Sequence, residues 1–321
     1  MAEQIEKKYT NEMLKEMQSW DLDRKIATSL TRIIEFANHF NNQVYVSFSG
    51  GKDSTVLLDL VRKVVPDIPA VFVDTGLEFP ELRQFVKNTQ NVITLRPEIS
   101  FRKVIEKYGY PIISKAVSHN VSIAKRNPEG LVKQNIFNPR KTGQYAMYKW
   151  SFLLSEAAPP VSDQCCNVMK KKPLHDFEKN TGLKPFMGTM ACESKIRKDK
   201  WIKNGCNAFD LKRPTSQPLS FWTEQDILAY IIKNNLNYAS VYGDILQNNK
   251  GHYYTTGATR TGCMYCLFGV HLEKEPNRLQ QLKETHKNIY DYIMKPWGEK
   301  GLGIKDTIDW INDNSWLDIK Y

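Results

Sequence analysis

The spacing of apolar residues in the first part of the chain switches between helix and strand patterns. Residues 11–40 begin polar and then carry apolar side chains at helical spacing, which predicts a helix packed beside the first strand. Residues 43–48 form a short run of strand-forming residues. Residues 57–64 return to helical spacing, and Pro66 ends that run. The pattern therefore predicts helix, strand and helix in succession.

The same alternation continues along the chain. Residues 70–73 and 91–95 are strand candidates with a predicted helix at 84–88 between them, and residues 185–188 are a later candidate. Strands that alternate with helices imply a parallel sheet with right-handed crossovers. We therefore predict an α/β protein whose parallel twisted sheet is flanked by helices.

Two further helices are predicted in the second half. One covers 223–234, where Thr223 and Asp226 form a candidate capping pair. A late amphipathic helix covers 279–293. Residues 116–160 have a less regular pattern with two Asn-Pro pairs, and we interpret them as an insertion or lid over the sheet.

These elements predict a division of the chain into three parts. An N-terminal helical segment covers 1–40, and the α/β domain that carries the sheet, with the insertion at about 116–160, covers 41–240. A C-terminal cysteine-bearing loop and helical tail follow at 241–321.

Composition indicates a globular protein, with 41% hydrophobic and 25% charged residues. No apolar run approaches the roughly 20 residues that cross a bilayer, and the polar N-terminus lacks the apolar centre of a secretory signal. We expect a soluble, cytoplasmic protein without a membrane partner. The 45 Lys and Arg exceed the 35 Asp and Glu, which suits anionic partners, nucleic acid included.

A glycine-rich loop between the first strand and the next helix is the strongest chemical signal. Its residues are Ser49, Gly50, Gly51, Lys52, Asp53, Ser54 and Thr55. A Walker A motif would need glycine where Val46 stands, and the dinucleotide pattern G-x-G-x-x-G is absent. We call residues 49–55 the glycine loop.

The glycine loop has the composition of an anion site. Glycines let the backbone approach an anion, and the amides at the start of a helix point at it with the helix dipole behind them. The three hydroxyls donate further hydrogen bonds, and Lys52 adds a positive charge. Asp53 either caps the helix or helps to hold a metal, which would be Mg²⁺ if ATP is the substrate.

Four of the six cysteines form two pairs. Cys165 and Cys166 are adjacent, and Cys263 and Cys266 form a CxxC pair, with 96 residues between the two pairs. Four thiolates suit tetrahedral zinc or a 4Fe-4S cluster, and the spacing does not separate these alternatives. Cys192 and Cys206 fall outside the pattern, and we interpret them as plain thiols.

Several segments, in order, resemble a known family. SGGKDS resembles the pyrophosphate loop (PP-loop) of the N-type ATP pyrophosphatases. FVDTGLEFPE (72–81), CCNVMKKKPL (165–174), GTMACESKIR (188–197) and the segment 217–238 are similar to blocks of the phosphoadenosine-phosphosulfate and adenosine-phosphosulfate reductase family. The resemblance runs from about residue 40 to 270 and implies the PP-loop fold, which is adenine nucleotide α-hydrolase-like.

The resemblance implies roles for individual residues. An adenine nucleotide would lie above the carboxyl edge of the sheet, with its phosphates in the glycine loop. Further nucleotide-binding residues would be Asp74, Thr75, Gly76, Glu193 and Ser194. Lys52, Asp53, Lys170 and Arg197 would act in catalysis. The paired cysteines would hold a 4Fe-4S cluster, and a reductant or sulfur-donor protein would be a partner.

Two departures from the family pattern concern the reaction itself. No cysteine follows Cys266, whereas the reductases use a C-terminal nucleophilic cysteine to attack sulfur. Met169 and Met190 stand where the family has arginines, so two planar donor groups for an anion are missing.

Three functions follow as alternatives. The first is reduction of a sulfonucleotide. The second is an ATP pyrophosphatase that adenylylates a substrate, for sulfur transfer to nucleic acid or another acceptor. The third is a non-catalytic regulatory or defence component that binds nucleotide and cluster.

Overall fold

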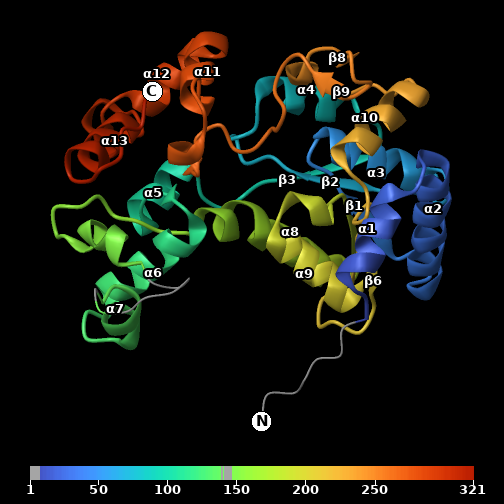
Figure 1. Cartoon of the computed structure of the whole chain (residues 1–321), viewed down its shortest axis with the longest axis horizontal. Helices are drawn as coiled ribbons and strands as arrows, with labels where there is room; N and C mark the ends of the chain where they lie inside the picture. Colours follow the sequence, from blue (N-terminus) through green and yellow to red (C-terminus); the bar gives the residue numbers. More distant parts are fainter. Residues whose placement is uncertain (1–7, 139, 141–146) are drawn as a thin grey trace. The chain divides into compact units, whose positions relative to one another are not determined.

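The computed structural model describes residues 8–138, 140 and 147–321 (Figure 1). Contacts divide the chain into two compact units. Unit 1 contains the chain up to Asp74, Glu78–Leu95 and Leu174–Thr261, and unit 2 contains Thr75–Leu77, Arg96–Pro173 and Gly262–Tyr321. The boundaries between these two units differ from the boundaries of the three predicted parts, and that three-part division stays a prediction.

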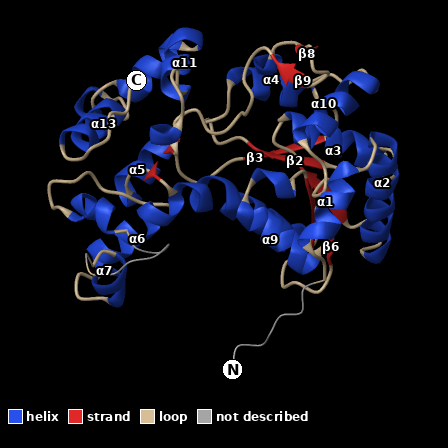
Figure 2. Cartoon of the chain, viewed as in Figure 1, coloured by secondary structure: helices blue, strands red, loops and turns tan. Residues whose placement is uncertain are grey.

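Unit 1 is built on a six-stranded sheet with the order β3-β2-β1-β5-β7-β6. Figure 2 draws the strands in red and labels the neighbours β2 and β3. Neighbouring strands are parallel except for β6, which is antiparallel to β7. The bounds are β1 Val44–Ser47, β2 Ala70–Val73, β3 Val92–Leu95, β5 Lys184–Met187, β6 Asn207–Ala208 and β7 Thr215–Ser216. The predicted parallel sheet is confirmed.

Helices flank this sheet, which confirms the predicted fold class. They are α1 Asn11–Ser19, α2 Leu22–His39, α3 Lys52–Arg62, α4 Pro80–Asn88, α9 Lys195–Asn204 and α10 Glu224–Lys233, with α8 Lys172–Thr181 beginning at the unit boundary. Helices α2, α3 and α10 contact one another, and α3 contacts β1 and β5. Their apolar faces and the strands share one core, in which Phe36, Phe186 and Trp222 are fully buried.

The predicted helix at 11–40 is two helices in the structure. Helix α1 ends at Ser19, and Asp21 then caps α2 by accepting a hydrogen bond from the Arg24 amide at 2.8 Å. The side chain of Lys25 in α2 is buried and pairs with Asp226 at 2.7 Å, which ties α2 to α10.

The capping pair predicted for α10 is present. One carboxylate oxygen of Asp226 accepts hydrogen bonds from the amide and the hydroxyl of Thr223, both at 2.7 Å. The bond from the Thr223 amide satisfies a backbone donor at the helix start that has no partner within the helix, and the bond from the hydroxyl holds the Asp226 carboxylate in place.

We expect Thr223→Ala to lower the free energy of unfolding by about 1 kcal/mol, because it removes the hydroxyl from this cap. Urea denaturation would measure the change. The control is Thr31→Ala on the exposed face of α2, for which we expect a change within about 0.5 kcal/mol. Equal effects of the two substitutions would contradict the capping role.

Unit 2 is mainly helical. Its helices are α5 Phe101–Tyr108, α6 Lys115–Arg126, α7 Leu131–Ile136, α11 Arg278–Thr285, α12 Lys287–Met294 and α13 Ile304–Asp313. Two short strands, β4 Ile112–Ile113 and β10 Leu267–Phe268, pair in parallel. The single late helix predicted at 279–293 is two helices in the structure, α11 and α12. Residues 116–160 belong to this unit, and their role as a lid remains a prediction.

No helix in the described ranges is long and apolar enough to cross a membrane.

Candidate functional site

The glycine loop lies where β1 ends and α3 begins, at the carboxyl edge of the sheet. Gly50 adopts a φ of +74°, and a Cβ there would lie 2.7 Å from Cγ2 of Val86. Gly51 is the N-cap of α3 and has no side chain to cap the helix. The loop conformation therefore requires glycine at position 50 and leaves the start of α3 open to other acceptors.

The three hydroxyls of the loop bond within the loop itself. The Ser54 and Thr55 hydroxyls donate to the Gly51 carbonyl at 2.9 and 3.1 Å. The Ser49 hydroxyl accepts from the Gly51 amide at 3.3 Å and lies 3.0 Å from the Ser54 hydroxyl. These bonds fix the shape of the loop.

Lys52 is the first residue of α3, and its side chain is only 6% exposed. Its ammonium group donates to the Thr259 carbonyl at 2.9 Å and pairs with the Glu224 carboxylate at 3.1 Å. Its backbone amide donates to the Tyr242 hydroxyl at 3.3 Å. A buried ammonium needs such partners because an unpaired buried charge is costly.

Asp53 follows Lys52 but does not cap α3. Its Oδ1 is buried and has no hydrogen-bond partner among the described residues. Burial has the largest effect on this carboxyl and raises its pKa, and the negative charge of Glu224 adds to the rise. The positive charges of Lys52, Arg260 and Arg197 oppose it without reversing it. The loop therefore holds a buried acidic group within electrostatic reach of three basic side chains, and Mg²⁺ there is a prediction from the sequence.

The predicted residues of segment 188–197 lie in unit 1, after β5. Glu193 accepts from the Met190 amide at 2.8 Å and pairs with Arg197, and Ser194 caps α9. A Cβ on Gly188 would lie 3.1 Å from the Asp53 carbonyl oxygen, so this segment packs against the glycine loop.

Asp74 also lies in unit 1, after β2, and pairs with Arg83 at 2.9 Å. Thr75 and Gly76 are assigned to unit 2, as is Lys170. The structure therefore groups the glycine loop, Asp74, Glu193, Ser194 and Arg197 in one unit and places three predicted residues in the other.

All four paired cysteines lie in unit 2. The sulfur atoms of Cys165 and Cys166 are 3.9 Å apart, and Cys266 donates its amide to the Cys263 carbonyl at 3.1 Å. The hydrogen bond with Cys166 raises the pKa of Cys165, and negative charge on Cys266 and Cys263 raises it further. The two pairs are thus close enough to interact electrostatically.

Basic groups accompany the cysteines. The hydrogen bond with Cys165, together with the charges of Lys115 and Lys170, lowers the pKa of Cys166 to about 6. Residues 96–173 contain 14 Lys and Arg but 5 Asp and Glu, so most of the positive excess of the chain lies in this segment. Thiolates in a positive environment suit a metal or cluster.

Within the described ranges, no three or more His, Cys, Asp or Glu side chains form a group that could hold a metal ion. The four thiols supply the donor chemistry that a 4Fe-4S cluster requires, and one pair is already close. The four thiols therefore fit the group by their chemistry alone, and a cluster on these cysteines remains a prediction.

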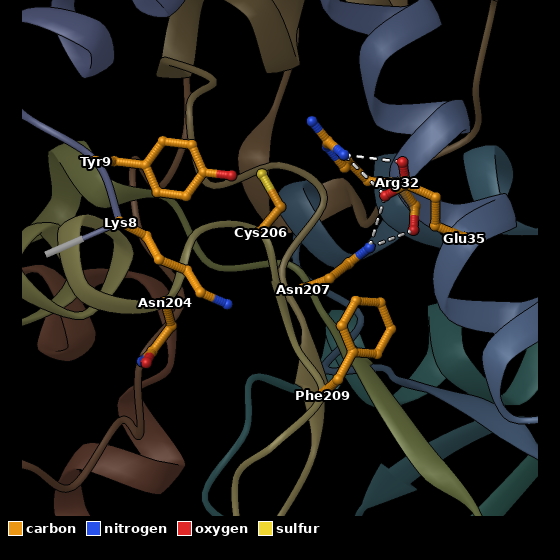
Figure 3. Close-up of a pocket in the computed structure, with 8 residues that line it drawn as sticks. All are labelled: Lys8, Tyr9, Arg32, Glu35, Asn204, Cys206, Asn207 and Phe209. Carbon is orange, nitrogen blue, oxygen red and sulfur yellow. Dashed lines mark hydrogen bonds and ion pairs between the residues drawn. The ribbon is translucent and has the colours of Figure 1, made fainter. Parts of the chain in front are cut away.

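The two remaining thiols have different surroundings, both in unit 1. Cys192 is exposed as a residue, and its thiol donates to the Trp222 carbonyl at 3.5 Å. Partial burial of the thiol raises its pKa, and the negative charge of Asp53 raises it further. Cys206 is buried and lines a separate cavity of about 140 Å³ with Tyr9 and Asn207 (Figure 3).

Four residues around Lys52 and Asp53 were not predicted from the sequence. They are Glu224, Tyr242, Thr259 and Arg260. Two features of the sequence mark where they lie. Glu224 is at the capped start of α10, and Tyr242, Thr259 and Arg260 belong to a segment rich in glycine and tyrosine before the CxxC pair.

A parallel sheet with a glycine-rich loop at its carboxyl edge defines an open-sheet α/β protein. Residues 43–116 and 114–267 match the family model of the phosphoadenosine phosphosulfate reductase domain. The chain belongs to this family, as its sequence motifs predicted.

Relatives are distant in sequence. An uncharacterized protein of Methanocaldococcus jannaschii is 25% identical over 84% of this chain and 51% of its own length. An adenosine 5'-phosphosulfate reductase of Lysinibacillus sphaericus is 27% identical over 71% of this chain and 74% of its own. The chain thus spans about half the length of the archaeal relative. A phosphoadenylyl-sulfate reductase structure from Candida auris covers 79% of this chain and 98% of its own, with a TM-score of 0.40 and 15% identity.

Proposed function

We propose that this protein binds the phosphates of an adenine nucleotide at the glycine loop and reduces a sulfonucleotide, with a 4Fe-4S cluster on its paired cysteines. The observation that carries this proposal is the extent of the family match. Residues 43–267 include both the glycine loop and all four paired cysteines. The Lysinibacillus sphaericus relative, named an adenosine 5'-phosphosulfate reductase, supports this substrate class.

The residues at the glycine loop have the chemistry for phosphate binding. The Lys52 ammonium and the amides at the start of α3 would neutralise phosphate oxygens. Arg197 and Arg260, both near Asp53, would add charge-assisted hydrogen bonds. When bound in unit 2, the cluster would supply redox-active iron.

The reaction consumes two electrons, which an external dithiol protein would supply. One thiolate of the dithiol would attack the sulfur of the phosphosulfate, so that the sulfur–oxygen bond breaks and the nucleoside phosphate leaves. The second thiolate would then attack the S-sulfonate, which forms the disulfide and releases sulfite, and the two thiol protons pass to solvent. A protein dithiol is therefore the partner that we propose.

One observation favours a second candidate, an ATP pyrophosphatase that adenylylates another acceptor. Met169 and Met190 occupy the positions where the family has arginines, and they are only 1% and 4% exposed. Neither offers a donor to a sulfonate. In this reaction Lys52 and Mg²⁺ would stabilise the departing pyrophosphate.

A parallel assay tests both candidates on anaerobically purified protein. Sulfite release from adenosine 5'-phosphosulfate with dithiothreitol would support the first candidate, and its absence would overturn it. Pyrophosphate release from ATP that depends on an added acceptor would support the second. Tight nucleotide binding with neither product would instead indicate the non-catalytic role.

A further inference from the structure

A short segment of unit 1 contacts the donors of the glycine loop. We call residues 256–261 the strap. It follows the antiparallel hairpin of β8 Ile245–Gln247 and β9 Tyr253–Thr255. The side chain of Gln225 in α10 bonds both backbone groups of Tyr253, at 2.9 and 2.8 Å, and so fixes the hairpin.

Tyr242 fastens the strap to the glycine loop. Its carbonyl accepts from the Gly257 amide at 2.9 Å, and its hydroxyl lies 2.7 Å from the Thr261 hydroxyl. The same Tyr242 hydroxyl accepts the Lys52 amide, and the strap carbonyl of Thr259 accepts the Lys52 ammonium. Tyr242 is 2% exposed, so this arrangement is a packed part of the fold.

The groups that the strap occupies are those that an anion would need. The first amides of a helix have no partner within the helix, and Lys52 provides both such an amide and a positive charge. The Tyr242 hydroxyl and the Thr259 carbonyl place oxygen atoms on these two donors. Phosphate oxygens would require the same donors, so the two sets of oxygens compete.

We propose that the strap and Tyr242 form a built-in competitor for the phosphate position, which the phosphates of the nucleotide displace on binding. This inference rests on the proposed function, because it takes the glycine loop as the phosphate site. The nucleotide must break the contacts that Tyr242 and the strap make with Lys52, and the free energy of those contacts lowers the measured affinity for the nucleotide. Weakening those contacts therefore tightens binding.

The test is the affinity of the full chain for inorganic pyrophosphate, measured by titration calorimetry. Tyr242→Phe keeps the buried ring and removes the hydroxyl, and we expect binding about 3- to 10-fold tighter. Thr261→Val, which removes the other hydroxyl of the pair, should shift affinity in the same direction. The control is Tyr254→Phe on the same hairpin, where the side chain is 45% exposed and no change is expected.

The outcomes separate this inference from the proposed function. If Lys52→Ala weakens pyrophosphate binding but Tyr242→Phe and Thr261→Val do not tighten it, the competitor is overturned and the phosphate site stands. If Lys52→Ala changes nothing, the phosphate site itself is wrong, and the competitor falls with it. If Tyr242→Phe binds pyrophosphate more weakly than the wild-type protein, the Tyr242 hydroxyl contacts the ligand, and the competitor is overturned. If no variant binds pyrophosphate, both are overturned.

Hydrogen exchange gives a second readout. Saturating pyrophosphate should speed amide exchange in a peptide that covers the strap, since the Gly257 and Ala258 amides are bonded to Tyr242 and Val241 at 2.9 Å in the structure. Slower or unchanged exchange would mean that the strap stays in place, and it would overturn the competitor.

Discussion

Lys52→Ala should weaken nucleotide binding by about 10- to 100-fold, because it removes a charge-assisted hydrogen bond to phosphate. The ammonium group is buried at the start of α3, where the proposed phosphate would also meet the helix amides. The substitution also removes the bond to the Thr259 carbonyl, which loosens the strap and offsets part of the loss. We therefore expect a net weakening, measured by titration with adenosine 5'-phosphosulfate or ATP.

Two further variants make this test specific. Lys52→Met keeps most of the buried aliphatic part of the side chain but removes the charge. If Lys52→Ala and Lys52→Met both lose affinity with unchanged circular dichroism spectra, the loss is due to the charge. Lys87→Ala, an exposed lysine in the last turn of α4, is the matched control and should bind normally. Unchanged affinity in both Lys52 variants would remove this residue from the phosphate site.

Cys263→Ser should abolish the iron–sulfur cluster that we propose on the paired cysteines, because a serine hydroxyl is a much poorer iron ligand than a thiolate. Metal binding and local order are coupled, so we also expect faster proteolysis around residues 262–272. Iron and sulfide content and the visible spectrum of anaerobically purified protein would measure the loss.

The matched control is Cys206→Ser, a buried thiol of unit 1 that accepts a hydrogen bond from Ser220 at 3.3 Å. That variant should keep full iron content. A full cluster in Cys263→Ser would exclude Cys263 as a ligand. A colourless wild-type protein with one zinc per chain would show that the site binds zinc and not a cluster.

The sheet was predictable because buried parallel strands are short apolar runs between turn signals. The predicted strand at 70–73 matches β2, and the predicted strand at 91–95 includes β3 Val92–Leu95. Helix ends were harder to predict. The break between α1 and α2 depends on the cap that Asp21 forms, and apolar spacing carries no information about a polar cap.

The contacts of Lys52 show why the site was only partly predictable. The loop itself is local in sequence, so its motif identified it. The Tyr242 hydroxyl and the Thr259 carbonyl lie 190 and 207 residues away along the chain, and only the folded structure brings them to α3. A backbone carbonyl has no sequence signature at all.

That last contact has an evolutionary consequence. Any residue at position 259 presents a carbonyl, so no single change of side chain there deletes the bond to Lys52. The strength of the competition would instead be inherited through Tyr242 and Thr261, whose hydroxyls a point mutation can remove. Relatives that diverge at these two positions would then differ in nucleotide affinity while keeping the same glycine loop.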